Sequence, residues 1–207
     1  MEKAPLIGIR RHRISTDGEG VTTLVAFHGC PLRCTYCLNR QCLEADGVWR
    51  EMTTAQLLDE VSVDSLYFLA TGGGITFGGG EPCLRSKFIE EFCQLADSRW
   101  HITLETSLNV ERHHLERLVP VVGQWIVDIK DMDDDIYRRY TQRDAGQARD
   151  NLRWLLSESD RAGRTIIRLP LIPDFNTPDD IRRSRAQLEA MGATHFDEFE
   201  YRTTFQV

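Results

Sequence analysis

A chain of 207 residues with 41% hydrophobic and 28% charged residues has the composition of one ordinary globular domain. The net charge of −7 argues against a nucleic-acid partner, and no stretch approaches the roughly 18 apolar residues that span a bilayer. The early arginines follow a short apolar patch in the wrong order for a signal peptide. We therefore expect one cytoplasmic domain over residues 1–207, with no membrane partner and with residues 1–20 as a lead segment.

In chain order, the apolar pattern predicts six strands, at residues 21–27, 75–77, 101–105, 125–129, 165–169 and 196–201. Before the first strand we expect a polar lead whose arginines (Arg10, Arg11, Arg13) are solvated. Helices are predicted from a capping box at Thr53, around Phe88, Phe92 and Leu95, after a cap at Asn109, over 147–161, and from Thr177-Pro178 to Gly192. This β/α alternation leaves open whether the sheet is doubly wound or a barrel.

Three cysteines lie close together in the chain, at Cys30, Cys34 and Cys37. Thiolates suit zinc, copper(I) or iron–sulfur clusters. Structural zinc sites take a second pair of ligands, and this sequence offers none at the usual spacing. Three cysteines on a four-iron cluster would leave one iron open to another ligand. An iron–sulfur site is therefore favoured over the alternative, a degenerate zinc knuckle.

The Cys-x3-Cys-x2-Cys spacing resembles the cluster loop of radical S-adenosylmethionine (SAM) enzymes. Together with Asp17-Gly18-Glu19-Gly20 and Gly79-Gly80-Glu81, the chain is similar to the pyruvate formate-lyase activating enzymes, a family of glycyl-radical enzyme activases. The resemblance runs from about Thr16 to about Tyr201. It implies an incomplete (β/α)6 barrel with its chemistry at the carboxyl ends of the strands.

The resemblance also implies a reaction. Cys30, Cys34 and Cys37 would bind a [4Fe-4S] cluster, whose electron splits SAM into methionine and a 5′-deoxyadenosyl radical. That radical would take a hydrogen atom from a backbone glycine of a glycyl-radical enzyme, with a flavodoxin or ferredoxin-type protein as electron donor. Two alternatives stay open: radical chemistry on a small molecule or peptide, and a redox sensor that holds a cluster without turnover.

Gly79, Gly80 and Glu81 follow a predicted strand. Glycine allows close backbone approach and positive φ, so this segment could meet the methionine ammonium of SAM, as the resemblance implies. The alternative is a plain tight turn.

Asp128 and Lys130 are two residues apart, so they project to one face of a strand. Among apolar neighbours such charges are costly unless they are paired or used. By resemblance Lys130 contacts the carboxylate of SAM, and Asp128 joins Glu105 and Thr106 at a monovalent-cation site. A simple salt bridge is the alternative.

Further residues are assigned by resemblance: Arg168 to the cofactor site, Tyr36 and Asn39 beside the adenine, and Asp17 facing the partner's backbone, with a simple turn aspartate as the alternative for Asp17. Of the other cysteines, Cys42 and Cys83 are expected near the site and Cys93 in the core. The chain departs from the family at Glu19 (proline), Thr22 (arginine) and Arg202 (histidine).

Overall fold

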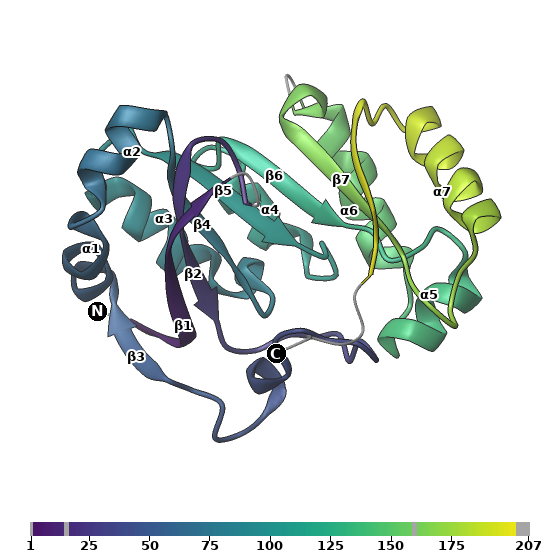
Figure 1. Ribbon diagram of the computed structural model, residues 1–207, viewed down its shortest axis with the longest axis horizontal. Helices are drawn as coiled ribbons and strands as arrows, with labels where there is room; N and C mark the ends of the chain where they lie inside the picture. The colour runs from purple at the N-terminus through teal and green to yellow at the C-terminus, as the bar shows by residue number, and fades with distance from the viewer. Residues whose placement is uncertain (1, 15–16, 159–160, 202–207) are drawn as a thin grey trace. The chain divides into compact units, whose positions relative to one another are not determined.

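The computed structural model describes residues 2–14, 17–158 and 161–201 (Figure 1). Contacts group the chain into two compact units, each built from separate segments. The first comprises Met1–Cys30, Asn39–Thr106 and Val110–Trp125, and the second comprises Pro31–Leu38, Ser107–Asn109 and Ile126–Val207. Among the described residues, no helix combines the length and the apolar character needed to cross a membrane.

The strands of the first unit follow the order β3-β1-β2-β4-β5. Their bounds are Lys3–Ile14 (β1), Val21–Phe27 (β2), Arg50–Thr53 (β3), Gly74–Gly79 (β4) and His101–Thr106 (β5). β2, β4 and β5 are parallel, while β1 pairs antiparallel with both β2 and β3. Phe77 of β4 lies opposite Val25 and Leu104, and all three are fully buried. The parallel strands thus form the centre of this unit's core.

β1 corrects the expectation of a polar lead segment. Ala4 and Leu6 are buried on this strand, and Arg11 donates to the Asp64 carboxylate at 2.8 Å and to Glu60 at 2.9 Å. The strand was not predicted because its arginines interrupt the apolar alternation that marks a strand. The expectation that these arginines are solvated is wrong for Arg11, which forms ion pairs.

The helices of the first unit are α1 (Thr54–Ser62), α2 (Ser65–Thr71), α3 (Ser86–Leu95) and α4 (Arg112–Leu118), with short 3-10 turns η1 (Arg40–Leu43) and η2 (Pro82–Arg85). α1 contacts α3, and α3 contacts α4. The predicted capping box is present: the Thr53 side chain accepts from the Gln56 amide, and Gln56 bonds back to Thr53. β3 and α2 are additional elements that the pattern did not indicate.

Two details of these helices were predicted wrongly. Leu95, the last residue of α3, is 51% exposed, so it does not share the buried face of Phe88 and Phe92. The residue that caps α4 is Glu111. Asn109 instead donates to the Asp144 carbonyl at 2.9 Å.

The next strands follow the order β6-β7-β8, with bounds Gln124–Asp128, Thr165–Leu171 and His195–Glu200. β7 and β8 belong to the second unit, as does β6 from Ile126 onward. β7 and β8 are parallel. Its helices are α5 (Asp134–Thr141), α6 (Gly146–Ser157) and α7 (Pro178–Ala190), with one 3-10 turn, η3 (Ala162–Arg164). The predicted helix start at Thr177-Pro178 is confirmed, and the structure adds a capping box between Thr177 and Asp180. α6 ends at Ser157, earlier than predicted, and α5 was not predicted.

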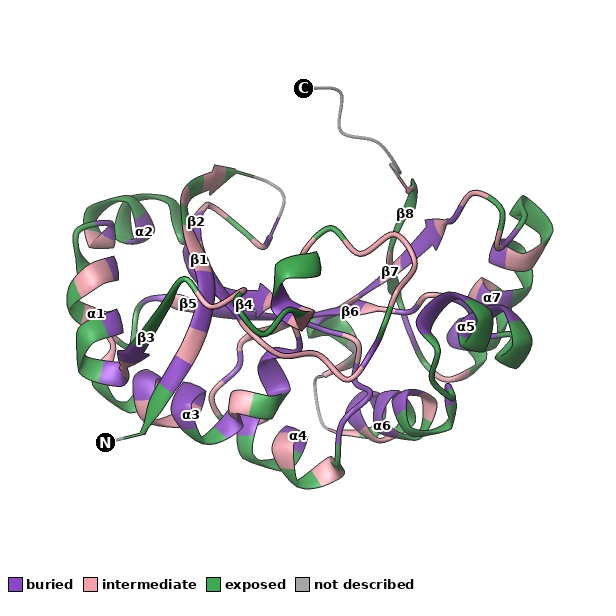
Figure 2. Cartoon of the chain, turned by 90° about the horizontal axis from the view of Figure 1, so that it is seen from below, coloured by how far each residue is buried: buried purple, intermediate pink, exposed green. Residues whose placement is uncertain are grey.

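The six predicted strands correspond to β2, β4, β5, β6, β7 and β8. Within the described residues, β3 and β8 each have one neighbouring strand, so the sheet does not close at either. Figure 2 shows buried residues along β4 and β7, whereas β8 is mostly exposed and the helices carry both buried and exposed residues.

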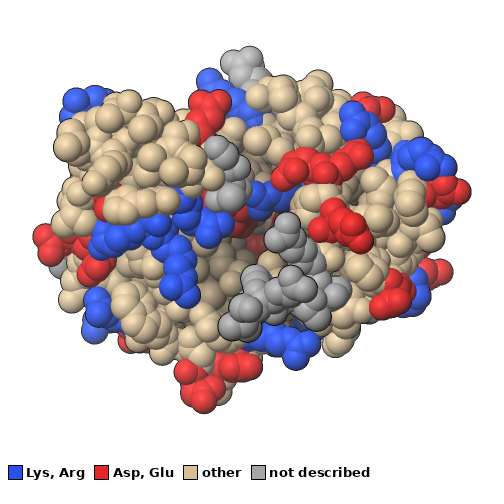
Figure 3. Space-filling view, in the orientation of Figure 1, with Lys and Arg blue, Asp and Glu red and all other residues tan. Residues whose placement is uncertain are grey.

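Charges of both signs are interspersed on the face drawn in Figure 3. Many arginines pair with nearby carboxylates. Arg138 lies 2.7 Å from Asp144, and Arg185 lies 2.6 Å from Glu198. Such exposed pairs contribute little individually to stability.

Candidate active site

In the second unit, the segment that carries Cys34 and Cys37 is held by the carbonyl end of α5. The Arg33 amide donates to the Thr141 carbonyl at 2.9 Å, and the Thr35 amide donates to the Tyr140 carbonyl at 3.0 Å. The last carbonyls of a helix have no partner within it, so α5 and the segment satisfy each other. Both amides that flank Cys34 are thereby fixed.

Lys130 lies in the same unit and pairs with Asp128, at 3.0 Å between Nζ and Oδ2. Burial disfavours the ammonium, but Asp128 and then Cys34 outweigh it and raise the pKa of Lys130. Burial raises the pKa of the Cys34 thiol to about 11, and Lys130 opposes that shift. The salt bridge between Lys130 and Asp128, which was one of two interpretations of the sequence, is therefore present. The Lys130 ammonium also interacts electrostatically with Cys34, a proposed cluster ligand.

Tyr36 belongs to an aromatic cluster that we define as Tyr36, Tyr140, Phe175 and Tyr201. Its ring centroid is 5.7 Å from that of Phe175 and 6.3 Å from that of Tyr140, and the Tyr201 hydroxyl donates to its carbonyl at 2.7 Å. The Tyr36 hydroxyl donates to Asp174 at 3.1 Å. Sequence reasoning missed the three other members, because they lie far along the chain and in no motif.

In the first unit, Cys30 follows β2. The Gly29 amide donates to the Cys42 carbonyl at 2.9 Å, and Cys30 packs against a buried group that includes Ala26 and Cys42. Cys42 is therefore beside a proposed ligand, as expected. Asn39 in turn donates to the Gly79 carbonyl at 3.0 Å, which connects it to the glycine segment.

The Gly79-Gly80 segment requires glycine for a packing reason. Gly79 has φ +91°, and a Cβ there would lie 2.7 Å from that of Ala26. A Cβ on Gly80 would lie 2.2 Å from the Gly29 carbonyl oxygen. The Gly80 amide donates to the Phe27 carbonyl at 2.9 Å. The end of β4 thus packs directly on the backbone that leads to Cys30.

Glu81 is 1% exposed. Its carboxylate accepts from the Thr106 hydroxyl at 2.7 Å and from the Cys83 amide at 3.2 Å. Cys83 Sγ lies 3.3 Å from Thr106 Oγ1, and burial, with Glu81 beside it, raises the pKa of this thiol. Cys83 is thus in contact with predicted site residues. Glu105 precedes Thr106 and lies close to Gly78. A Cβ on Gly78 would be 2.9 Å from the Glu105 carboxylate.

Two other predicted residues have partners within the protein. Arg168 of β7 lies opposite Asp197 of β8, at 3.4 Å between Nε and Oδ2. Asp17 is 2% exposed and accepts from Arg13 at 2.8 Å. The Asp17 carboxylate is thus paired with Arg13 in the structure. Cys93, expected in the core, is only half-buried on α3. Arg202 and Thr16 lie outside the described residues.

The donor chemistry of the cysteine segment suits an iron–sulfur cluster. All three thiols are half-buried, and all are free of disulfides. The backbone on either side of Cys34 is tied down independently of any metal. Over residues 2–14, 17–158 and 161–201, no group of three or more His, Cys, Asp or Glu side chains is arranged to hold a metal ion. The ligand assignment therefore continues to rest on the motif and its chemistry.

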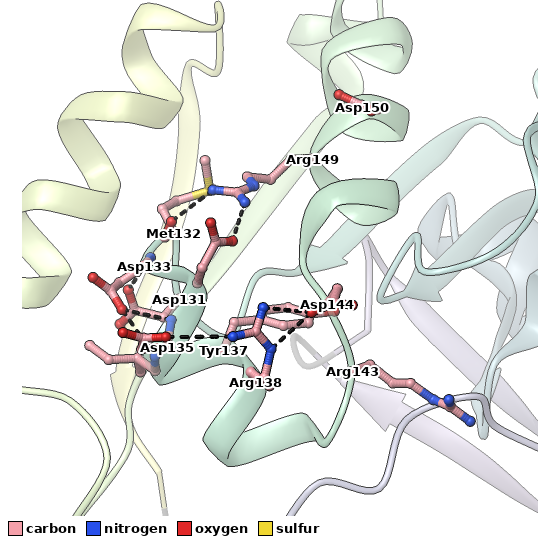
Figure 4. Close-up of polar contacts among 12 residues, drawn as sticks. Asp131, Met132, Asp133, Asp135, Tyr137, Arg138, Arg143, Asp144, Arg149 and Asp150 are labelled. Carbon is pink, nitrogen blue, oxygen red and sulfur yellow. Dashed lines mark hydrogen bonds and ion pairs between the residues drawn. The ribbon is translucent and has the colours of Figure 1, made fainter.

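A separate pocket of about 300 Å³ lies in the second unit, between the acidic segment Asp131–Asp135 and α7. Figure 4 shows how the polar contacts of this segment reach α5 and α6. Asp131 is buried and accepts from Asn176 and from Ser184, each at 3.0 Å. Both carboxylate oxygens of Asp131 therefore already accept hydrogen bonds from within the unit.

The match to a family model decides the identity of the chain. The radical SAM superfamily model matches residues 24–184. The chain belongs to the radical SAM superfamily. The sequence-based recognition is confirmed.

The sequence is also similar to that of a characterised group of enzymes. It is 31% identical over 173 residues to the pyruvate formate-lyase-activating enzyme of Staphylococcus aureus, a match that covers 80% of this chain and 68% of that enzyme.

Solved structures show the fold. Streptococcus suis SuiB bound to S-adenosylmethionine has a TM-score of 0.65 at 12% identity, over 88% of this chain and 43% of SuiB. A radical SAM methyltransferase from Sphaerobacter thermophilus has a TM-score of 0.53 at 16% identity, over 96% of this chain and 78% of that one. This chain thus spans less than half of SuiB. The predicted fold class, an incomplete barrel of the radical SAM type, is confirmed.

Proposed function

We propose that this radical SAM enzyme is a glycyl-radical enzyme activase. Cys30, Cys34 and Cys37 would hold a [4Fe-4S] cluster, which supplies one electron for reductive cleavage of SAM to methionine and a 5′-deoxyadenosyl radical. The hydrogen atom would come from a backbone glycine of a large partner enzyme. The observation that carries this proposal is the 31% identity to a pyruvate formate-lyase-activating enzyme over most of both chains.

The protein's own residues have distinct tasks in this proposal. Lys130, which keeps its proton beside Asp128, would bind the carboxylate of SAM. The backbone of Gly79 and Gly80 would receive its ammonium, and Tyr36 and Asn39 would flank the adenine. Glu81 follows these glycines, and its buried carboxylate accepts hydrogen bonds from the Cys83 amide and the Thr106 hydroxyl. Arg168 would face the ligand from β7.

Three parts of the proposal depend on the family resemblance alone. Asp128, Glu105 and Thr106 would bind a monovalent cation, Asp17 would face the partner's backbone, and a flavodoxin or ferredoxin-type protein would deliver the electron. None of the six cysteines forms a disulfide, which suits a reducing compartment such as the cytoplasm.

Anaerobic reconstitution with iron and sulfide, followed by dithionite and SAM, tests the chemistry. An active enzyme should release 5′-deoxyadenosine and methionine, and the Cys34→Ala variant should release neither. A cluster-bearing sensor would bind iron and release no 5′-deoxyadenosine.

Mixing the reduced enzyme and SAM with candidate glycyl-radical enzymes tests the partner. A doublet glycyl radical in the electron paramagnetic resonance spectrum identifies the pair. Cleavage of SAM without such a radical on any candidate would instead favour a small-molecule or peptide substrate. That alternative is supported by the fold shared with SuiB and a radical SAM methyltransferase.

A further inference from the structure

Five exposed apolar side chains gather on one side of the first unit. They come from the end of β1, from the residue after α1 and from α2, and we call them the α2 face: Ile14, Val63, Leu66, Tyr67 and Leu69. Among the described residues, ten large apolar side chains are exposed, so half of them lie in this one place. Scattered exposed apolar residues are ordinary, but a contiguous group indicates an interaction surface.

Contacts between β1 and α2 make the group contiguous. The His12 ring packs edge-on against that of Tyr67, at 4.7 Å between centroids. Ile14 lies opposite Val21 in the sheet, and the Val21 amide donates to the Thr71 hydroxyl at 2.8 Å. The end of β1 and the exposed side of α2 therefore form one surface.

α2 is fixed to the unit from its other side. Phe68 is fully buried and meets Trp100 edge-on, at 5.2 Å between centroids. Asp64, at the start of the helix, is buried and accepts from Arg11 at 2.8 Å and from the Thr23 hydroxyl at 2.9 Å. These anchors leave the α2 face outside the core, so the packing of the unit does not explain its apolar character.

We propose that the α2 face is the interface of a homodimer, in which a second copy of this chain covers it across a two-fold axis. A two-fold contact joins the same patch on both copies, so the surface must be complementary to itself. α2 carries no charged residue, and the face therefore meets its own copy without repulsion between like charges. This inference does not depend on the proposed radical chemistry.

The exposed area suits a weak, reversible dimer. The five side chains are between 38% and 77% exposed. Side chains of this size then present on the order of 500 Å² of apolar surface on one copy. Two copies would together bury about 1,000 Å², the lower limit for a specific interface. A membrane fits this face less well, because helices that lie on membranes carry Lys and Arg beside their apolar side, and α2 has neither.

Sedimentation velocity of the reconstituted protein over a concentration series tests the dimer. The wild-type mass should rise from that of one chain toward that of two as the concentration increases. Leu66→Glu places a carboxylate at the most exposed position of the α2 face. The dimer dissociation constant should rise about a hundredfold in this variant, because like charges would meet in the interface. Its urea midpoint in dilute solution should stay that of the wild type.

Leu95→Glu is the matched control. Leu95 is 51% exposed at the end of α3, a helix that packs against α1 and α4, so this variant should dimerise as the wild type does. Leu66→Lys tests the two-fold geometry. Alone it should stay monomeric, but an equal mixture with Leu66→Glu should dimerise, because opposite charges then share the interface.

A wild-type protein that stays monomeric at every concentration overturns the inference, as does an equal loss of dimer in Leu66→Glu and Leu95→Glu. A monomeric mixture of the two Leu66 variants rejects the two-fold contact. If Leu66→Glu instead abolishes binding of a glycyl-radical enzyme to monomeric protein, the face belongs to that partner. Release of 5′-deoxyadenosine is a separate readout, and its failure in the wild type would overturn the proposed function without affecting the dimer.

Discussion

In the first unit, the Gly79–Glu81 segment packs closely against the backbone after β2 and against buried side chains. In the second unit, the Cys34–Cys37 segment is instead held by hydrogen bonds to the last carbonyls of α5. Gly80 has no room for a side chain, and Glu81 has its bonds within the unit. Around Cys34, by contrast, the nearby charge is the half-buried ammonium of Lys130, which pairs with Asp128. The first region supplies a closely packed backbone, and the second supplies a cation beside a proposed cluster ligand.

The largest effect that separates these regions is expected from Cys34→Ala. Removal of one thiolate leaves the proposed cluster with only two of its three cysteine ligands. The bound iron should fall to background while the protein stays folded. Iron and sulfide analysis after anaerobic reconstitution, with visible absorbance, measures this.

Cys93→Ala is the control for Cys34→Ala, because Cys93 is a half-buried thiol on α3 outside the motif. It should retain full iron. Equal iron in the two variants would contradict the ligand assignment.

Gly80→Ala should act on folding rather than on cluster chemistry. The new Cβ would lie 2.2 Å from the Gly29 carbonyl oxygen, so backbone must move. We expect a loss of about 3 kcal/mol in the free energy of unfolding, measured by urea denaturation of the cluster-free protein.

The matched variant Gly146→Ala places a Cβ where no atom lies within 4 Å. Its urea midpoint should be that of the wild type or slightly higher. If Gly80→Ala is equally stable, then the first unit is not held by this backbone contact.

Lys130→Met should weaken SAM binding and leave the iron content unchanged. A charge-assisted hydrogen bond contributes about 1.5–3 kcal/mol, so the Kd should rise about tenfold or more. Equilibrium binding to the reconstituted protein measures this. Lys87→Met removes a cation whose side chain is 73% exposed and should leave the Kd unchanged. An unchanged Kd for Lys130→Met would mean that Lys130 does not bind SAM and serves only as the salt-bridge partner of Asp128.

The smallest predicted effect compares one capping box from each unit. Thr53→Ala and Thr177→Ala should each cost about 1 kcal/mol of stability near pH 7. Their pH dependence should differ, because the second box uses Asp180 and the first uses the uncharged Gln56.

The bond to Thr177 lowers the pKa of Asp180 below its ordinary 3.8. A depressed carboxyl pKa contributes stability above the ordinary value, and that contribution is lost as the pH falls through the folded-state pKa. The cost of Thr177→Ala should therefore shrink in acid while that of Thr53→Ala stays constant. Urea unfolding of both variants at neutral and acidic pH measures this, and parallel pH profiles would contradict it.

The sequence allowed prediction of elements whose signals are local. Six strands, the capping box at Thr53 and the helix start at Thr177-Pro178 were predicted, because an apolar run, a Thr-x-x-Gln spacing or a Thr-Pro pair can be recognised without tertiary contacts. β1 was missed because its arginines interrupt the apolar alternation, and the ion pairs of Arg11 with the distant Glu60 and Asp64 are visible only in the folded chain. α5 was missed because charges dominate it: the apolar contacts of Ile136 and Tyr140 are visible only once the chain is folded.

The candidate site divides in the same way. Cys30, Cys34, Cys37 and the Gly-Gly-Glu segment were recognisable because they form spaced motifs. Tyr140 belongs to no motif, and its ring contacts with Tyr36 and Phe175 exist only in the folded chain. Likewise, the glycines were expected to serve a ligand, but the structure adds a packing requirement that no local pattern contains.

The amides on both sides of Cys34 donate to the last carbonyls of α5. A substitution that unwinds the end of this helix should therefore also displace the backbone around Cys34, although the helix and the cysteine segment lie about one hundred residues apart in the chain.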